Sequence, residues 1–552
     1  MNYHRSDRIM NGRILDARNE ARRAENVDLV IIGGGATGAG CALDAQLRGL
    51  RTVLLEGHDF GSGASSASTK MAHGGVRYLQ EAVTSLDFKQ FRFVGHSLHE
   101  RRTMLLNAPH LTRPLEFLVP CPSRGQQVYY GIGMKIYDWI AGSERLIPSR
   151  FLSRGEALRR LPALHPERVA AAVSYSDGQI DDARYNLALM GSFIEAGGVA
   201  VNYSRVTGFA RDANGRITTA TVEDRVSGEP WTVGARVFLN ATGPYSDGVR
   251  QLASPKAVPR MRPSKGVHIL FPLGEFPDNV SLLVPKTEDG RVIFAIPWQG
   301  RLLVGTTDDA VTVDAPMTVT RDEVEYLLRQ LNPYLAHPLR AADVVSAFAG
   351  IRPLVASPGV EDTKTLIRDD EVEVDEASGL VSILGGKWTT YRLMAERTID
   401  CVEQRLGLPV SACKTRQHPL SGAQGYSAEF WRTLTPRVPE ATARHLASKY
   451  SACAGKVAEL IEEDAAFGQP LVEGMPQIRA QVVYAARHEM AVSIEDVLAR
   501  RIGLQFFGWR EALAAALPTG EVLGKELAWS SAQVEQAVEE YSRSLGALVP
   551  SP

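Results

Sequence analysis

The chain has 552 residues, more than one compact core usually holds, so we expect two or three lobes. Apolar residues make up 44% and charged residues 22%, as in ordinary folded proteins, and a formal charge of −2 argues against a nucleic-acid binder. The five cysteines include no C-x-x-C pair. We therefore expect neither a disulfide framework nor a metal site, and a reducing cytosolic setting fits better.

Residues 1–26 form a polar, arginine-rich N-terminal extension. Because this segment lacks an apolar stretch, we do not expect a secretory signal. No run of about 18 uninterrupted apolar residues occurs in the sequence, which argues against a membrane-spanning helix. Any membrane contact should then be peripheral.

The first predicted unit is a strand, a helix and a second strand. The apolar run 27–32 closes on glycines, a helix of small residues is predicted over 36–48, and Thr52–Leu55 is the next apolar run. These segments span about thirty residues, the minimum for a right-handed parallel crossover.

A dinucleotide motif lies inside this unit. Gly33, Gly35 and Gly38 fit G-x-G-x-x-G, and Glu56 ends the second strand. The motif alone is weak because 49 of the 552 residues are glycine, but its place between a strand and a helix makes it specific. The glycines permit a tight turn, close approach of pyrophosphate and close helix packing, while Glu56 can bind ribose hydroxyls. The alternative is a purely structural glycine-rich turn.

The remaining sequence alternates strands and helices to about residue 405, which indicates α/β architecture with inserted antiparallel material. From about residue 427, helix follows helix, with Ser493 and Asp496 as a capping-box-like start for one of them. The segment 406–425, rich in proline, glycine and serine, marks the boundary. Among the predicted elements are strands over residues 236–240, 264–270, 292–296, 302–304 and 380–384, and helices over 181–196, 391–404 and 477–490.

Three loops have a composition suited to cofactor contacts. Residues 63–70 (GASSASTK) are small and hydroxyl-rich, and residues 240–244 (NATGP) end a predicted strand. Residues 385–390 (GGKWTT) end another strand and lead into a helix. That helix would direct its N-terminus at a bound ring system, and its field would favour an anionic reduced flavin.

Several longer motifs are distributed over the chain: 65–78 (SSASTKMAHGGVRY), 175–184 (YSDGQIDDAR), 305–308 (GTTD), 349–354 (AGIRPL), 385–392 (GGKWTTYR), 484–490 (YAARHEM) and 496–501 (DVLARR). With these motifs the sequence resembles the FAD-dependent glycerol-3-phosphate dehydrogenases of the D-amino-acid-oxidase-like flavoprotein superfamily. The resemblance covers nearly the whole chain from Val27, and the extension before Val27 is longer than the usual lead.

The resemblance implies three domains. A Rossmann-type FAD-binding domain would comprise residues 27–90, 165–250 and 345–405. An interleaved antiparallel-sheet substrate domain would comprise residues 91–164 and 251–344, and a C-terminal all-helical domain residues 406–552.

The resemblance also implies the reaction. The enzyme would oxidise sn-glycerol 3-phosphate to dihydroxyacetone phosphate by hydride transfer from C2 to flavin N5, and pass the electrons to a membrane quinone. It would act at the cytoplasmic face of the inner or cell membrane, or in the cytoplasm; a homodimer stays open. We expect FAD to be noncovalent, with contacts from Gly33, Gly35, Gly38, Glu56, Ser65, Ser66, Ser68, Lys70, Val206, Thr242, Gly243, Gly386, Lys387 and Thr389.

By the same resemblance, six residues converge over the flavin. Arg352 precedes a proline in an apolar stretch, and Lys387 lies at a helix start, where a cation has no favourable dipole interaction. His268 would accept the proton of the C2 hydroxyl, and Arg352 could instead stabilise the alkoxide. A core histidine and a buried ion pair are the structural alternatives. We predict His268, Arg352 and Lys387 as catalytic, and Arg77, Tyr78 and Arg368 as substrate-binding; a surface salt bridge with Asp369 or Asp370 is the alternative for Arg368.

Two segments are candidates for the membrane surface. Residues 128–141 (VYYGIGMKIYDWIA) have an interfacial composition, although a buried amphipathic helix is equally supported. The second candidate is the region of Arg500, Arg501, Leu504, Phe506, Phe507, Trp509 and Arg510.

Two other functions stay open at this point. One is a sister oxidase that passes electrons to oxygen, and the other is a flavin-binding sensor or assembly protein without turnover.

Overall fold

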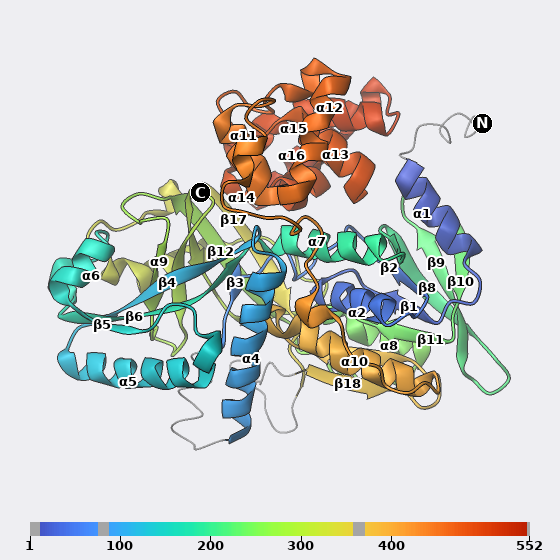
Figure 1. Cartoon of the computed structure of the whole chain (residues 1–552), viewed down its shortest axis with the longest axis horizontal. Coiled ribbons are helices and arrows are strands. Elements are labelled where there is room, and N and C mark those ends of the chain that lie inside the picture. Colours follow the sequence, from blue (N-terminus) through green and yellow to red (C-terminus); the bar gives the residue numbers. More distant parts are fainter. Residues whose placement is uncertain (1–11, 76–87, 357–369, 549–552) are drawn as a thin grey trace.

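The computed structural model describes residues 12–75, 88–356 and 370–548 (Figure 1). Two mixed α/β regions lie side by side, and the C-terminal helices form a separate layer over both (Figure 1). This arrangement confirms the predicted fold class.

Within the described residues, six strands form the sheet of the nucleotide-binding region. β1 (Leu29–Ile32) and β2 (Thr52–Leu55) are parallel, with Leu29 opposite Thr52, and β1 also pairs in parallel with β11 (Val237–Asn240). Every residue of these three strands is buried, which explains their continuous apolar runs. The full order is β18 (Asp370–Val374), β19 (Val381–Gly385), β11, β1, β2 and β7 (Val199–Val201), with β18 antiparallel at one edge.

Helices of small residues pack closely on this sheet. α2 (Ala36–Leu47) contacts both α7 (Asp182–Glu195) and α10 (Tyr391–Arg405). A Cβ at Gly40 would lie 2.8 Å from the ring of Tyr391, so the small side chains of α2 allow the close approach. α8 (Ser246–Ala253) contacts β11 and β19 of the sheet, and it also contacts β8 (Ser204–Arg211). β8 forms an antiparallel ribbon with β9 (Ile217–Asp224) and β10 (Pro230–Gly234).

The N-terminal extension contributes a helix that we did not predict, α1 (Gly12–Arg23). Arg18 is buried, and its Nε lies 3.1 Å from Oδ2 of Asp224 on β9. Arg22 stacks over the ring of Trp231 on β10. The arginine-rich composition of this segment therefore serves packing against the ribbon.

The second mixed region is built on a larger, mostly antiparallel sheet. Its main path in the described chain runs β16 (Asp309–Ala310), β12 (Ser264–Pro272), β15 (Arg301–Gly305), β14 (Ile293–Trp298), β13 (Val280–Val284), β4 (Thr112–Cys121), β6 (Ala171–Ile180) and β3 (Met71–Ala72). β17 (Ser346–Arg352) pairs with β12, and β5 (Arg150–Ser153) pairs with β6. The helices of this region are α4 (Phe88–Asn107), α5 (Arg124–Ala141), α6 (Arg154–Arg160) and α9 (Arg321–Leu331).

The domain ranges expected from the sequence differ from this topology at three strands. β3, β6 and β17 fall inside the ranges predicted for the FAD-binding domain, yet they hydrogen-bond in the large sheet. β6 is buried along its whole length, and β17 is an apolar strand. A buried strand has the same composition in either sheet, so only the pairing assigns it.

The C-terminal region has its own apolar core. It comprises α11 (Glu440–Tyr450), α12 (Ala454–Glu463), α13 (Arg479–Glu489), a π-helical turn over Asp496–Arg501, α14 (Leu504–Phe507), α15 (Trp509–Glu526) and α16 (Ser531–Gly546). The predicted capping pair is confirmed, because Asp496 N donates to Oγ of Ser493 and Ser493 N donates to Oδ2 of Asp496, both at 3.1 Å.

The second predicted membrane surface is wrong. Arg500 is 6% exposed and Arg501 is fully buried, and Leu504 and Phe506 pack in apolar cores. Both arginines form ion pairs inside the protein, which accounts for cations beside apolar residues. None of the helices in residues 12–75, 88–356 and 370–548 is long and apolar enough to cross a bilayer.

Candidate active site

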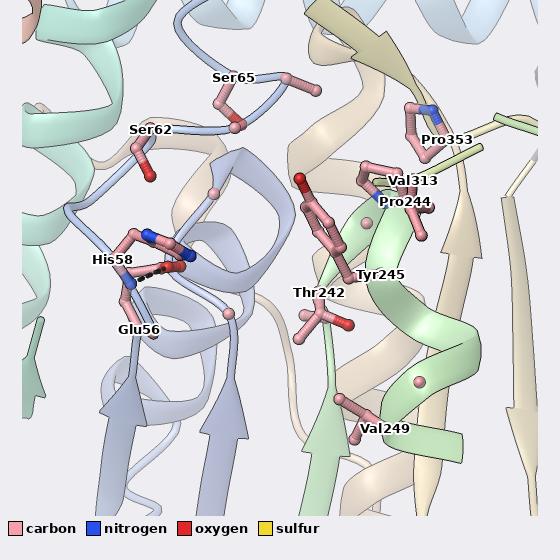
Figure 2. Close-up of a pocket in the computed structure, with 18 of the residues that line it drawn as sticks. Glu56, His58, Ser62, Ser65, Thr242, Pro244, Tyr245, Val249, Val313 and Pro353 are labelled. Carbon is pink, nitrogen blue, oxygen red and sulfur yellow. Dashed lines mark hydrogen bonds between the residues drawn. The ribbon is translucent and has the colours of Figure 1, made fainter. Parts of the chain in front are cut away.

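A cavity of about 1230 Å³ opens at the carboxyl ends of β1, β2 and β11 (Figure 2). Ligands of open α/β sheets bind at this edge, and the volume exceeds the range of about 300–1000 Å³ typical of small-molecule pockets. A ligand as long as a dinucleotide therefore fits. Most of the wall comes from residues within 32–37, 56–65, 203–206, 241–252, 310–314 and 495–500.

The loop of the glycine motif lines the cavity with Gly33 and Gly35, where the motif predicts the phosphates of the cofactor. Gly33 has φ +110°, and a Cβ at Gly38 would lie 1.9 Å from the carbonyl oxygen of Gly33, so both positions require glycine. Gly35 lies just before α2, and a Cβ there would approach Oγ of Ser65 to 2.9 Å. Ser65 accepts a hydrogen bond from Ala36 N at 2.9 Å. Ala36 and Thr37 of the first helical turn line the cavity, and the N-terminus of a helix is a favourable place for anionic oxygens.

Glu56 lines the end of the cavity at which the motif places ribose. Its Oε2 accepts from Gly34 N at 2.6 Å and its Oε1 accepts from His58 N at 2.8 Å. Burial raises the pKa of Glu56, and the two backbone donors oppose that rise. Val206 lines the same end from β8.

Thr242 and Gly243 line the cavity from the end of β11. The Thr242 hydroxyl donates to Oδ1 of Asn240 at 2.7 Å, and Gly243 adopts φ +56°. Gly38, in contrast, lies beneath the loop and acts through packing against Gly33.

Ser66, Ser68 and Lys70 do not line this cavity, and the side chains of Ser68 and Lys70 turn towards Asp182 at the start of α7. The Ser68 hydroxyl donates to Oδ2 and the Lys70 ammonium to Oδ1 of Asp182, both at 2.6 Å, and Lys70 also donates to the Ser66 carbonyl at 2.6 Å. Asp182 binds the side chains of Ser68 and Lys70, and their contact with the cofactor stays a prediction, as it does for Ser66. Asp182 thereby fixes the loop that carries Ser65.

His268 lies on β12 directly opposite Gly305 of β15 and is 2% exposed. Its Nε2 is 3.0 Å from the Thr69 hydroxyl, and its ring stacks on Phe348 with centroids 4.9 Å apart. Burial lowers the pKa of His268 well below its usual value, and the nearby Arg352 and Lys70 cations lower it further. The imidazole is therefore neutral near pH 7. Its buried Nδ1 has no hydrogen-bond partner among the described residues.

Arg352 ends β17 on the strand next to β12. Because His268 pairs with Phe348 and Ser264 pairs with Arg352, strand alternation places His268 and Arg352 on the same face of the sheet. Nη2 of Arg352 donates to the Thr306 hydroxyl at 2.8 Å and to the Thr307 carbonyl at 2.9 Å. These contacts fix the orientation of the guanidinium.

Lys387 lies at the glycine-rich start of the helical segment that leads into α10. Its ammonium lies 4.3 Å from the centroid of the Phe93 ring. The next residues connect this segment to the other loops: Trp388 Nε1 donates to the Ser65 carbonyl at 2.8 Å, and Thr389 accepts from His73 N at 3.1 Å. Gly386, at φ +89°, leaves room for Met394, since a Cβ would lie 2.1 Å from its Cε.

Comparison with known sequences identifies the family. The profile of the FAD dependent oxidoreductase family matches residues 28–392, and that of the C-terminal domain of alpha-glycerophosphate oxidase matches residues 413–534. A probable mitochondrial glycerol-3-phosphate dehydrogenase of Caenorhabditis elegans is 41% identical over 95% of this chain and 74% of its own length. The chain belongs to the FAD-dependent glycerol-3-phosphate dehydrogenases. The mitochondrial enzyme of Rattus norvegicus, 39% identical over 94% of this chain and 73% of its own length, agrees.

Solved structures extend the likeness to the fold of this dehydrogenase. The glycerol-3-phosphate dehydrogenase of Bacillus halodurans, complexed with FAD, superposes with a TM-score of 0.77 and 31% identity over 98% of both chains. L-alpha-glycerophosphate oxidase of Mycoplasma pneumoniae shares the fold, with a TM-score of 0.53 and 17% identity over 72% of this chain and 98% of its own.

FAD is the cofactor of this dehydrogenase family, and the residues present fit it. Gly35 and Ser65 line the cavity at the start of α2, where a glycine leaves room for the Ser65 hydroxyl. From there the cavity extends from Glu56 to Thr242 and Gly385. Noncovalent binding of FAD stays a prediction.

Four residues of the cavity wall were not predicted from the sequence. Tyr203, Tyr245, Asp496 and Arg500 line the cavity, although no motif marked them as cofactor contacts. Asp496 and Arg500 come from the C-terminal helices, and nothing local indicates a contact across more than 400 residues of sequence. The predicted substrate residues Arg77, Tyr78 and Arg368 lie outside the described residues.

Proposed function

We propose that this enzyme oxidises sn-glycerol 3-phosphate to dihydroxyacetone phosphate and passes the electrons to a membrane quinone. The observation that carries the proposal is the placement of a neutral histidine, His268, and a fixed cation, Arg352, on one face of adjacent strands. A secondary alcohol that loses a hydride must also lose its hydroxyl proton, so a base and a cation beside C2 are what the reaction requires. The names of the relatives support the substrate.

His268 is the proposed proton acceptor. When Nε2–H donates to the Thr69 hydroxyl, the lone pair is on Nδ1, which no described protein group binds. The low pKa of His268 keeps the imidazole unprotonated near pH 7, so one ring nitrogen carries a lone pair. FAD, when bound, supplies the hydride acceptor, N5 of its ring.

Arg352 and Lys387 are the proposed cationic groups. A guanidinium held by Thr306 and Thr307 can stabilise the developing alkoxide without moving, which is the condition for electrostatic catalysis. Lys387 adds a second positive charge where the local helix would favour an anion. Arg77, Tyr78 and Arg368 remain the proposed ligands of the substrate phosphate, because the planar arginine fork binds phosphate oxygens in pairs.

We further propose peripheral binding to the cytoplasmic surface of a membrane through α5. The sequence allowed two interpretations of this segment, a buried amphipathic helix and a membrane-surface helix. Met134 and Tyr137 pack inwards, as the first requires, while one outer stripe is apolar and exposed, as the second requires. The stripe comprises Val128 (53% exposed), Tyr129 (53%), Ile132 (56%) and Trp139 (79%). Such a face can enter the lipid interface, where quinone is accessible. A homodimer stays a prediction.

The reaction is tested with purified protein, glycerol 3-phosphate and an artificial dye acceptor without oxygen. We expect the flavin absorbance to bleach and the dye to be reduced, with no reaction from glycerol, which lacks the phosphate. Stoichiometric peroxide in air would favour an oxidase, and no bleaching would contradict an enzymatic role on this substrate.

A further inference from the structure

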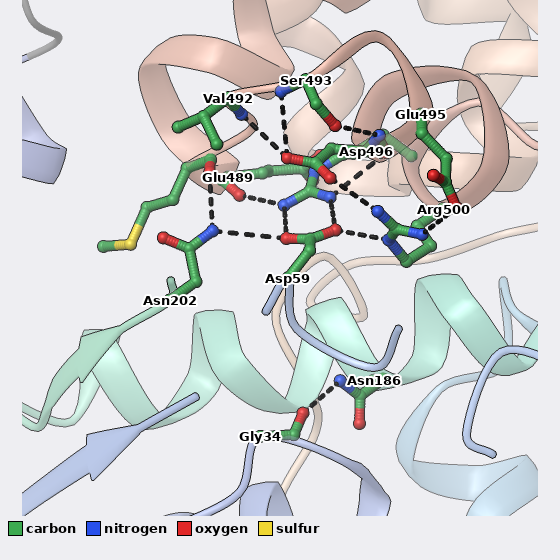
Figure 3. A network of polar contacts seen from close by, with 12 residues as sticks. Gly34, Asp59, Asn186, Asn202, Glu489, Val492, Ser493, Glu495, Asp496 and Arg500 are labelled. Carbon is green, nitrogen blue, oxygen red and sulfur yellow. Dashed lines mark hydrogen bonds and ion pairs between the residues drawn. The ribbon is translucent and has the colours of Figure 1, made fainter. Parts of the chain in front are cut away.

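The loop that follows Glu56 contains a buried carboxylate, Asp59, that faces away from the parallel sheet and towards the C-terminal helices (Figure 3). Asp59 lies three residues after Glu56 and two before Gly61, whose N–H donates to the Gly34 carbonyl at 3.1 Å. It therefore belongs to the segment that connects the ribose end of the cavity to the phosphate loop.

Two adjacent arginines of the C-terminal region bind Asp59. Arg501 donates to both carboxylate oxygens, at 2.8 Å to Oδ1, and Arg500 Nε donates to Oδ2 at 2.5 Å. Asn202, at the end of β7, donates to Oδ1 at 3.3 Å and to the Met490 carbonyl at 2.8 Å. Asp59 thus joins the nucleotide-binding region to the segment that follows α13.

The outer members of the same network are part of the cavity wall. Arg500 Nη2 donates to Oδ1 of Asp496 at 2.6 Å, and the Tyr203 hydroxyl donates to the same oxygen at 2.8 Å. Arg500, Asp496 and Tyr203 all line the cavity, together with Glu495. Figure 3 shows Arg500 between Asp59, Asp496 and Glu495.

Burial makes this network sensitive to the loss of a single member. Burial alone would raise the pKa of Asp59, but the Arg501 and Arg500 guanidinium groups outweigh it and lower the pKa to about 2. Asp59 is therefore a full charge at neutral pH. Removing one side of a buried ion pair leaves the other charge uncompensated, so the loop and the C-terminal segment must shift together.

We propose that the C-terminal helical region completes the FAD site: Asp59, held by Arg500 and Arg501, is a positioning residue for the adenosine end of the cofactor. The docking of this region and the binding of FAD then stabilise each other, since coupling between two binding events is reciprocal. The proposal depends on FAD binding in the cavity and not on the substrate or the electron acceptor.

The test measures FAD dissociation from purified holoenzymes by the recovery of flavin fluorescence on dilution. Asp59→Asn keeps the shape of the side chain and removes its charge, and we expect the dissociation constant to rise about tenfold, within the usual range of coupling energies. Arg500→Met leaves the Arg501–Asp59 pair intact, so it should fold even if Asp59→Asn does not, and we expect a rise of about threefold.

Glu489→Gln is the matched control. The Glu489 side chain forms a largely buried ion pair with Arg184 of α7 at 2.8 Å, in the same interface, but contacts neither the Asp59 side chain nor the cavity. Only the backbone carbonyl of Glu489 accepts from Arg501, and the substitution keeps that carbonyl. We expect its FAD dissociation constant to stay within about twofold of the wild type, even where its melting temperature falls as far as that of Asp59→Asn.

Hydrogen–deuterium exchange tests the reciprocal effect. The peptide over residues 490–502 should exchange about threefold more slowly in the holoenzyme than in wild-type protein stripped of FAD. Equal exchange rates, or FAD dissociation constants of Asp59→Asn and Arg500→Met equal to that of the Glu489→Gln control, would overturn the proposal.

Discussion

Gly266 of β12 makes room for Arg352 of β17: a Cβ at Gly266 would lie 2.2 Å from Nη2 of the arginine. The same relationship holds between Gly305 and His268, where a Cβ would lie 2.3 Å from Cδ2 of the imidazole. His268 and Arg352, two of the three proposed catalytic side chains, therefore each lie across a glycine of the neighbouring strand. The two glycines allow large polar side chains to lie flat on the sheet.

Gly266→Ala should retain FAD and lose most turnover. The new methyl group must displace the guanidinium of Arg352, which is the flexible end of a side chain, so the strand itself can stay in place. We expect a loss of about tenfold or more in kcat/KM, up to the roughly hundredfold of a removed transition-state contact. Gly208→Ala on β8 is the control, because no atom lies within 4 Å of a Cβ built there. Equal kcat/KM for the two variants would contradict the role of Arg352.

Arg352→Ala and Lys387→Ala should each keep the flavin absorbance but lose activity with glycerol 3-phosphate. Removing a charge-assisted contact made in the transition state costs on the order of 3 kcal/mol, about a hundredfold in rate. Steady-state kinetics with a dye acceptor measure the loss, with the FAD content of each variant as the control. A variant that keeps more than about half of wild-type turnover has lost no contact of this size.

Acid should weaken the fold through His110. Burial lowers the pKa of this histidine to about 3, and the neighbouring Arg184 cation lowers it further. Between the unfolded value near 6.5 and about 3, the unfolded chain binds a proton that the folded chain does not, so stability falls as the pH falls. The slope is about 1.4 kcal/mol per pH unit for one group.

Urea unfolding at pH 5, 6 and 7 measures this effect. In His110→Gln the free energy of unfolding should fall less between pH 7 and pH 5, by about 2 kcal/mol in total, because the unfolded histidine becomes fully protonated only towards pH 5. The same slope in the variant and the wild type would show that His110 already takes up its proton in the folded protein.

The exposed stripe of α5 should govern binding to lipid. Replacing Val128, Ile132 and Trp139 by serine removes three exposed apolar side chains and leaves the buried face of the helix intact. We expect binding to anionic vesicles to fall about tenfold or more, because one well-buried apolar side chain contributes roughly 1.5–3 kcal/mol.

Vesicle co-flotation measures the loss, and dye reduction in solution should stay unchanged. The control replaces Leu513 and Leu517 of α15, which are also exposed and apolar, and should bind like the wild type. Equal flotation of both variants would place the membrane contact elsewhere.

The sequence by itself determined those features that depend on interactions between residues close together along the chain. The turn at Gly33, the helix start after Gly35 and the acid at Glu56 depend on neighbours in the chain, so their pattern alone predicted the nucleotide cavity. The apolar runs of β1, β2 and β11 likewise predicted buried strands, and the crossover between β1 and β2 predicted that this pair is parallel. The longer motifs added the family and, through it, the fold class.

Only the tertiary structure decided which partners each polar side chain finds. Lys70 binds Asp182 instead of facing the cavity, and Arg500 and Arg501 close on Asp59 instead of forming a surface. The sequence also did not determine which sheet β3, β6 and β17 join, because a buried strand has the same composition in either sheet. The free energy of a buried charge depends on the countercharge that folding brings beside it, and for Asp59 that countercharge lies more than 400 residues away along the chain.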